Sequence, residues 1–361
     1  MEQHPVNSSL LSGKEHIKLE NGSNIGYRSF VIFLICCGLL LAAFAVSSVW
    51  LRYDDGPLHD WGSFFDGETE TSDGSSALET SPVGDTAENE IVTDGAVTIP
   101  EGAIPVRAMD LSYPSLGRYY IHNETVYRPN VEALLDVDVS SAAVGDKPLV
   151  LILHTHTSES YLPKGTAFLT EAPGNVTYSD NAEENVLAVG EELCRVLKEK
   201  GITALHCTVM HDVPTLSGAY DRSEETVRKY LETYPDIEYV IDLHRDAVMT
   251  SDGAYIRSIA KEGEDAVAQV MAVVGSDGNG THHENWENNL ALALRLREKL
   301  NANGASVCRP VSLRNASFHQ ELAKHSLLLE IGTGGNTVEE AKRAAALVGE
   351  ALADLIKGEN G

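Results

Sequence analysis

Blocks of apolar and polar positions predict an α/β domain in the C-terminal two thirds of the chain. Short apolar runs typical of buried strands lie at 149–153, 202–207, 238–244, 254–259, 267–275 and 326–331. Segments with helical spacing lie at 183–200, 223–233, 286–301 and 337–357, and a small hairpin is expected at 118–129. Strands that alternate with helices of this length are typical of α/β folds. We therefore expect a largely parallel or mixed central sheet flanked by helices.

An uncharged apolar run of a different kind lies near the N-terminus, at Phe30–Leu51. At about 1.5 Å per residue, this run is long enough to cross the roughly 30 Å hydrocarbon core of a bilayer. Basic residues precede the run and acidic residues follow it, which favours residues 1–29 as a cytoplasmic tail. We therefore expect a single-pass transmembrane anchor. A signal peptide cleaved after Ala45 stays open as the alternative.

Residues 52–106 show neither a helical nor a strand period and are rich in Gly, Ser, Thr, Asp and Glu. Such a segment buries too little apolar surface to offset its ordering entropy, so we expect a disordered acidic linker before a catalytic domain at 107–361. The 361 residues carry a net charge of -27. This charge argues against nucleic acid and anionic membrane surfaces as direct partners.

Three predicted strands end in residues that can bind a metal or transfer a proton. "LILHTHTSES" contributes His154, His156 and Glu159, "VIDLHRDA" contributes His244, and "LLLEIG" contributes Glu330. In an open α/β sheet, ligands bind outside the carboxyl ends of the strands. Burial of uncompensated polar groups costs several kcal/mol, so this convergence favours a functional site over core filling.

Imidazole and carboxylate groups are typical ligands of Zn²⁺, and a catalytic zinc ion keeps three protein ligands and one open position. His244 is one expected ligand, and one of His154 and His156 is another. We prefer His156, because it lies in the loop just beyond the strand. The third expected ligand is Glu159 or a carboxylate within 180–184.

Glu330 is then the expected acid/base residue, because a carboxylate that does not bind the metal can accept and return a proton. An alternative is a metal-independent serine hydrolase with Ser158 as nucleophile and His244 and Asp246 as partners. That alternative lacks the GxSxG elbow that normally presents such a serine on a strained turn.

Several stretches resemble the stage II sporulation protein P family of endospore-forming bacteria, which is related to zinc N-acetylmuramoyl-L-alanine amidases. They are "LILHTHTSESYLP", "NVLAVGEELCRVLKEKGI", "YPDIEYVIDLHRDA", "WENNLALALRLREKL" and "LLLEIGTGGNTVEEA". The resemblance implies a single amidase-like domain that cleaves the amide between N-acetylmuramic acid and the stem peptide of peptidoglycan, with an additional endopeptidase activity.

The same resemblance implies a cellular setting. It implies thinning of the septal cell wall during engulfment, together with stage II sporulation proteins D and M. It also implies that the anchor holds the protein in the cell membrane, with the catalytic domain outside the cytoplasm at the septal or engulfing membrane of the mother cell. A non-catalytic wall-binding or scaffold protein of the engulfment machinery is the alternative.

The family's essential histidines correspond to His244 and to His156 or His154, and the catalytic glutamate of the wider amidases corresponds to Glu330. One departure concerns the third zinc ligand. The wider amidases place a ligand glutamate four residues before the Asn that opens the first long helix, and the equivalent position here is Asn181. The third ligand therefore stays open among Glu159, Glu183 and Glu184.

Overall fold

The computed structural model describes residues 82–83, 97–261, 263–278 and 280–359, which all belong to the unit Leu58–Gly361. Residues 1–29 and the expected anchor at 30–51 lie outside the described residues. Within the described ranges, no helix combines the length and the apolar character needed to cross a membrane.

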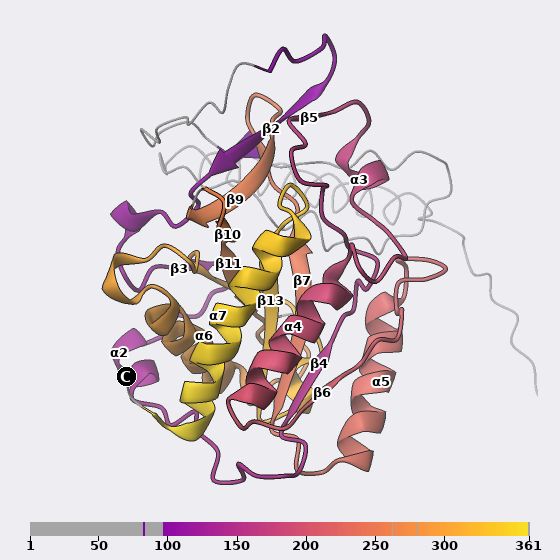
Figure 1. Cartoon of the computed structure of the whole chain (residues 1–361). Helices are drawn as coiled ribbons and strands as arrows, with labels where there is room; N and C mark the ends of the chain where they lie inside the picture. The colour runs from indigo at the N-terminus through magenta and orange to yellow at the C-terminus, as the bar shows by residue number, and fades with distance from the viewer. Residues whose placement is uncertain (1–81, 84–96, 262, 279, 360–361) are drawn as a thin grey trace, which may run out of the picture. The chain divides into compact units, whose positions relative to one another are not determined.

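A seven-stranded mixed sheet forms the centre of the described domain (Figure 1). Its order is β3 (Ile121–Asn123), β12 (Val311–Leu313), β11 (Val270–Val274), β13 (His325–Thr333), β7 (Tyr239–Asp246), β4 (Val150–Leu153) and β6 (Ala204–His206). The strands β13, β7, β4 and β6 run parallel to one another. The strands β11, β12 and β3 also run parallel to one another, and β11 joins β13 in antiparallel register. The expected central sheet is confirmed in its mixed form.

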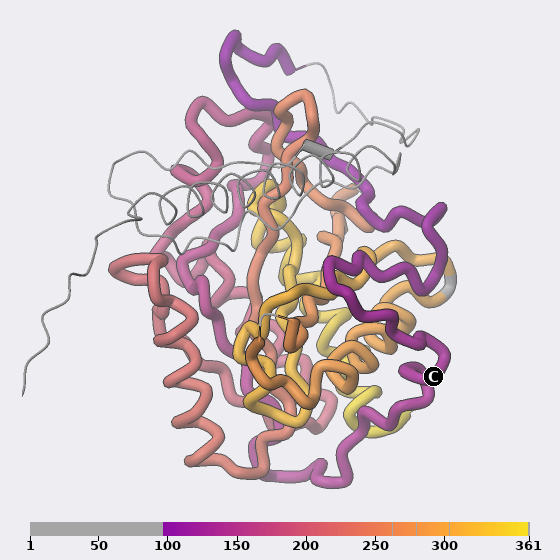
Figure 2. Tube along the Cα trace, turned by 180° about the vertical axis from the view of Figure 1, so that it is seen from behind, coloured from indigo at the N-terminus to yellow at the C-terminus, as the bar shows by residue number. Residues whose placement is uncertain are grey.

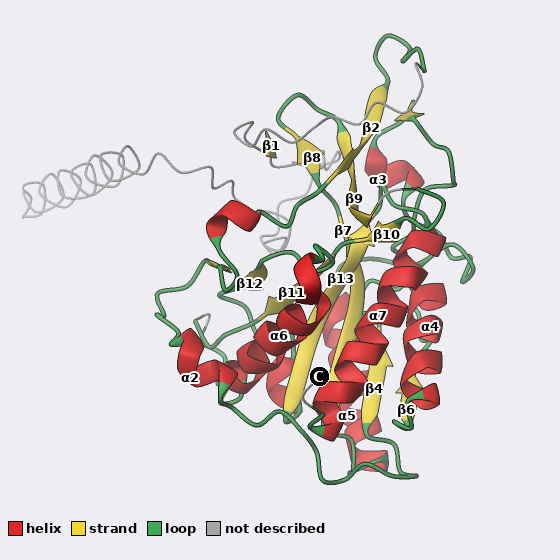
Figure 3. Cartoon of the chain, turned by 60° about the vertical axis from the view of Figure 1, so that its left-hand side comes forward, coloured by secondary structure: helices red, strands yellow, loops and turns green. Residues whose placement is uncertain are grey.

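Long helices cover both faces of this main sheet (Figure 3). They are α4 (Val186–Glu199), α5 (Ala219–Thr233), α6 (Trp286–Leu300) and α7 (Val338–Lys357). Ile152 packs in the same apolar cluster as residues of α4, α6 and α7. Leu151 and Leu153 instead pack with Val227 of α5, which lies on the other face (Figure 2). Both faces are therefore buried, which is why the strands have continuous apolar runs.

The helix ends follow from local capping chemistry. The Asn185 side chain accepts a hydrogen bond from the backbone N–H of Leu187 and so begins α4. Thr337 and Glu340 form a capping box at the start of α7, and Gly358 ends that helix in the left-handed region. The predicted helices agree with the observed ones within a few residues, and the largest difference is the start of α5, four residues earlier than expected.

A second, smaller sheet lies at the end of the main sheet where β7 and β13 finish (Figure 1). Its strands are β1 (Pro82–Val83), β8 (Met249–Thr250), β9 (Tyr255–Lys261), β2 (Ile104–Met109) and β5 (Phe168–Leu169), and β10 (Val267–Ala268) pairs with β9. Two short helices are α2 (Val131–Leu135) and α3 (Pro173–Val176). β1 and residues 104–106 of β2 fall within the linker expected at 52–106, and residues 52–81 and 84–96 of that linker lie outside the described residues.

The expected hairpin at 118–129 is wrong. Only β3 forms in this stretch, and it pairs in parallel register with β12. After β3, Thr125 donates hydrogen bonds from its backbone N–H and its hydroxyl to the Asn123 side chain, which turns the chain. The Tyr127 ring then stacks on Trp286, with ring centroids 4.9 Å apart. The residues that were expected to form the second strand of the hairpin therefore pack against α6 instead.

Candidate metal centre

The parallel strands β4, β7 and β13 bring three polar strand ends to one edge of the main sheet. His244 lies on β7, and Glu330 is its register partner on β13. β4 ends at Leu153, and the chain then turns through the loop that contains His156 and Glu159. The backbone N–H of Glu159 donates to the carbonyl of His156 at 3.1 Å, which keeps these two side chains on one side of the turn.

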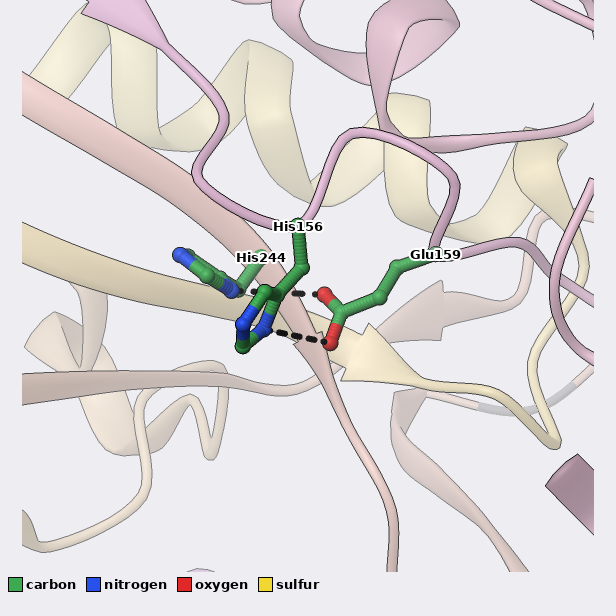
Figure 4. A group of neighbouring side chains, drawn as sticks. All are labelled: His156, Glu159 and His244. Carbon is green, nitrogen blue, oxygen red and sulfur yellow. Dashed lines mark ion pairs between the residues drawn. The ribbon is translucent and has the colours of Figure 1, made fainter. Parts of the chain in front are cut away.

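His156, Glu159 and His244 form a compact cluster (Figure 4). Nδ1 of His156 lies 3.5 Å from Oε1 of Glu159, and Nδ1 of His244 lies 3.4 Å from Oε2. One potential ligand atom from each residue lies within 4.8 Å of the others. Two atoms bound to one tetrahedral zinc ion at about 2.0–2.1 Å are about 3.3–3.4 Å apart. The donor types and their spacing therefore fit a metal ion of this kind.

Contacts from two other segments hold the His156–Glu159 loop in place. The backbone N–H and the hydroxyl of Ser158 both donate to Oδ2 of Asp212, at 2.9 and 2.5 Å. The Glu159 carbonyl accepts from the backbone N–H of Val186, the first residue of α4. The loop is thus fixed on one side by Asp212 and on the other by the start of a long helix.

Arg245 keeps the buried Glu159 carboxyl ionised. Its backbone N–H donates to Oε2 of Glu159 at 3.0 Å, and its buried guanidinium lies 4.0 Å from Oε1. Burial alone would raise the pKa of Glu159, but the Arg245 charge and the hydrogen bonds from His156 and His244 hold this pKa well below its usual value. An ionised carboxylate is the form that binds a metal.

Asp242 lies behind His244 on the side away from Glu159. Nε2 of His244 is 3.0 Å from Oδ1 of Asp242, although the two are not aligned as a hydrogen bond. Thr155 donates to both Asp242 oxygens, at 2.8 Å from its backbone and 2.7 Å from its hydroxyl. Burial opposes ionisation of Asp242, but the nearby His244 lowers its pKa. In metal sites, a carboxylate behind a ligating histidine orients the ring, and Asp242 is close enough to His244 for its charge to act in this way.

Glu330 has the properties of a proton carrier. It is buried, and its Oε2 has no hydrogen-bond partner in the described chain. Burial, followed by the charge of Asp246, raises the pKa of Glu330 to about 8, while His244 opposes this shift. A carboxyl with a pKa near neutrality can both accept and donate a proton at physiological pH.

Tyr220, near the start of α5, is part of the site although the sequence did not indicate it. Its ring makes an edge-on contact with His156, with centroids 5.6 Å apart. Its hydroxyl is buried and has no hydrogen-bond partner among the described residues. Burial, then the charges of Asp242 and Glu330, raise its pKa well above the usual value. Tyr220 therefore adds an uncommitted O–H donor beside the cluster.

His154 does not join the cluster, which corrects its inclusion among the candidate ligands. Nδ1 of His154 lies 2.8 Å from the Leu243 carbonyl oxygen, and Nε2 lies 2.9 Å from Nε2 of His206. Burial lowers the pKa of His154 to about 3, so the ring is neutral. Gly190 makes room for this pair, because a Cβ there would lie 2.7 Å from both Nε2 atoms.

The other carboxylates considered for the third ligand lie elsewhere. Glu183 and Glu184 are exposed, and Glu184 accepts a hydrogen bond from the Ser179 hydroxyl at 3.3 Å. Of the three open candidates, the structure thus brings only Glu159 to His156 and His244.

The serine hydrolase triad also does not assemble. The Ser158 hydroxyl donates to Asp212, and Asp246 forms a 2.6 Å ion pair with Arg309. Neither side chain is therefore available to His244.

The fold and this cluster define a mixed α/β protein with a candidate His–Glu–His metal centre. More particularly, the chain belongs to the Stage II sporulation protein P family, whose model matches residues 85–353. The Stage II sporulation protein P of Bacillus subtilis (strain 168) is 28% identical over 229 residues, which cover 60% of this chain and 53% of that protein. The chain thus spans about half the length of this curated relative.

Two solved structures are similar over part of the chain. An N-acetylmuramyl-L-alanine amidase of Mycobacterium abscessus is 14% identical with a TM-score of 0.35, and the match covers 58% of this chain and 99% of that chain. The catalytic domain of the N-acetylmuramoyl-L-alanine amidase CwlV from Bacillus (Paenibacillus) polymyxa var. colistinus is 14% identical with a TM-score of 0.32, covering 57% and 95%.

Proposed function

We propose that this protein is a zinc-dependent peptidoglycan hydrolase of sporulation that cleaves the N-acetylmuramoyl-L-alanine amide. The observation that carries the proposal is the cluster of His156, Glu159 and His244 beside the protonatable Glu330. Membership of the Stage II sporulation protein P family supports the biological setting. Cleavage of cross-links within the stem peptide is part of the same proposal.

In this proposal His156, Glu159 and His244 hold the zinc ion. The bound ion would supply Lewis acidity, which polarises a carbonyl group and makes a water molecule more acidic. Asp242 orients the His244 ring, and Arg245 keeps Glu159 in its ionised form. Contacts within the chain therefore orient one ligand and keep another ionised before any substrate binds.

The remaining residues of the site move and donate protons. Oε2 of Glu330 accepts the proton of the attacking water and returns it to the amine nitrogen of L-alanine, so that the amide bond breaks without release of an unstable amide anion. The Tyr220 hydroxyl donates a hydrogen bond to the oxygen that gains negative charge on the muramoyl carbonyl. Both groups suit these roles because neither Oε2 of Glu330 nor the Tyr220 hydroxyl has a partner in the described chain.

The location is also part of the proposal. We place the protein in the cell membrane through residues 30–51, with the catalytic domain outside the cytoplasm at the septal or engulfing membrane of the mother cell. The chain's net charge of -27 opposes adhesion to anionic wall polymers. Recruitment by protein partners, with stage II sporulation proteins D and M as the candidates, fits this charge better. Normal septal localisation in cells that lack both candidates would argue against recruitment.

Mass spectrometry of muropeptides released by the full chain tests the activity. Purified peptidoglycan should yield free stem peptides that begin at L-alanine, chelation should abolish their release, and added zinc should restore it. Activity that survives exhaustive chelation would exclude the zinc mechanism. If the zinc-loaded protein binds peptidoglycan but releases nothing, a scaffold role replaces the enzyme. A Ser158→Ala variant that folds normally but loses all activity would revive the serine hydrolase.

A further inference from the structure

A pocket of about 450 Å³ lies at the C-terminal end of α6, apart from the metal cluster. Its wall is formed by residues 112–118, by the last turn of α6 and by the segment 301–306. A volume of this size suits a small organic ligand better than a bare ion. None of the roles described above uses this pocket.

Arg297 gives the pocket an uncompensated positive charge. This side chain lines the pocket, although the residue is only 6% exposed. Its Nε donates to the Arg309 carbonyl at 3.1 Å. Its Nη1 and Nη2 form no hydrogen bond or ion pair with any residue in the described part of the chain. Burial, together with the positive charge of Arg118, lowers the pKa of Arg297.

The neighbouring groups do not neutralise this charge. Glu298, the carboxylate nearest in sequence, pairs with Arg118 and accepts a hydrogen bond from the Tyr119 hydroxyl at 3.1 Å. The Asn301 side chain is engaged with the backbone of Cys308. Nη1 and Nη2 are not among the fully buried unpartnered atoms of the described chain, so an anion that enters the pocket could pair with this charge.

The pocket lies at the same edge of the main sheet as the metal centre. Cys308, which follows the pocket segment, forms a β-bridge with Val270, and Val270 pairs with Ile331, the residue after Glu330. Cys308 and Ile331 are therefore two strand spacings apart, about 10 Å. Arg309 also connects the pocket side of the sheet to β7, the strand of His244, because its guanidinium pairs with Asp246 at the end of β7 at 2.6 Å.

We propose that this pocket binds a small organic oxyanion, a carboxylate or a phosphate, through Nη1 and Nη2 of Arg297. The planar guanidinium fork donates two parallel hydrogen bonds to two oxygens of such a group. Two sources of this chemistry are the carboxylates of a peptidoglycan stem peptide and the phosphate group of a small organic phosphate ester. Only the stem-peptide source rests on the proposed function, and the anion site itself does not.

Isothermal titration of the full chain tests the site with two probes, the free tripeptide L-Ala-D-Glu-meso-diaminopimelate and glycerol 3-phosphate. At least one probe should bind, and Arg297→Met should weaken its binding about tenfold or more. Arg297→Lys, which keeps the charge but loses the fork, should weaken it less. Arg128→Gln, an equal loss of charge at an exposed arginine, should leave it unchanged. Binding of the tripeptide identifies the stem peptide as the source of the oxyanion, and binding of glycerol 3-phosphate identifies an organic phosphate.

Two results would overturn the proposal: neither probe binds the wild-type chain, or binding is unchanged in Arg297→Met. If Arg297→Met does not fold, as judged by circular dichroism, Arg297→Lys decides, and wild-type affinity in that variant would count against the fork. Because the readout is binding and not hydrolysis, the outcome is independent of the proposed activity. Arg297-dependent binding by a chain that cleaves nothing would keep the anion site and reject the hydrolase.

Discussion

Glu330 and His244 occupy paired positions on the adjacent parallel strands β13 and β7. Paired residues on neighbouring strands project from the same face of a sheet, so the register alone places the acid/base candidate beside a metal-type imidazole. His244 is in turn held between Glu159 and Asp242. The chemistry proposed for this site therefore depends on strand register as much as on residue type.

Glu330→Gln should separate metal binding from catalysis. Glutamine has nearly the same shape but cannot accept and return a proton, so we expect unchanged zinc content and a fall in kcat of about 10²–10⁴-fold. Zinc stoichiometry by atomic absorption and release of stem peptides from peptidoglycan measure the two quantities. Loss of zinc in this variant would instead place Glu330 among the ligands.

His156→Ala and His154→Ala should have opposite effects. The first removes a cluster member and should abolish stoichiometric zinc binding while stability without metal changes little. The second leaves the cluster intact but removes the contacts of a buried ring with Leu243 and His206. It should lower the free energy of unfolding by about 2–4 kcal/mol and keep the zinc. Denaturant unfolding and zinc stoichiometry check both variants, and the reverse pattern would restore His154 as the ligand.

The sequence indicated that the two histidines matter and favoured His156, but it did not show where the His154 ring lies. Residues two apart in a strand point to the same face, so His154 and His156 are equivalent by period alone. The strand ends at Leu153, as its apolar run predicted, and the turn that follows sends the two rings to different neighbours. That turn depends on Asp212 and on the start of α4, which are distant in sequence.

Other site residues differ in how far the sequence indicated them. Asp242 is two residues before His244 in a predicted strand, so the period of two places both side chains on the same face. Tyr220 offered no such signal, because its contact with His156 arises only when α5 packs on the sheet.

The same contrast holds for the fold. Long apolar runs and helical spacing predicted the main strands and helices, and the capping by Asn185 places the start of α4 at Val186. The second sheet joins 104–109 to 255–261, segments about 150 positions apart, which no local pattern reveals.

Asp242→Asn should weaken metal binding without removing a ligand. The amide is nearly isosteric with the carboxylate but lacks the charge that orients the His244 ring, so zinc affinity should fall roughly 10–100-fold. Competition with a chromophoric chelator measures the affinity. Asp252→Asn, the same substitution at an exposed site outside the cluster, is the matched control and should bind zinc like the wild type. Equal affinity in Asp242→Asn would show that Asp242 does not orient the ligand.

His325 should make the stability of the domain depend on pH, far from the metal centre. Its ring is buried and stacked on Tyr239, with centroids 5.0 Å apart, and neither ring nitrogen has a hydrogen-bond partner in the described chain. Burial, together with the charge of Lys324, lowers the pKa of His325 to about 4. The unfolded chain takes up this proton near pH 6.5, whereas the folded chain does so only near pH 4. Stability is therefore full above pH 6.5 and is lost as the pH falls toward 4, by at most about 1.4 kcal/mol per pH unit from this group.

His325→Phe should remove this loss and keep the stacking on Tyr239. Urea unfolding at pH 7.5 and pH 5 should give a smaller difference for the variant than for the wild type, because phenylalanine takes up no proton in either state. His282→Gln removes a histidine from an exposed position and is the control, with the wild-type difference expected. An equal pH dependence in His325→Phe and wild type would mean that the folded chain protonates His325 as readily as the unfolded chain does, through local opening of the β13 end that carries it.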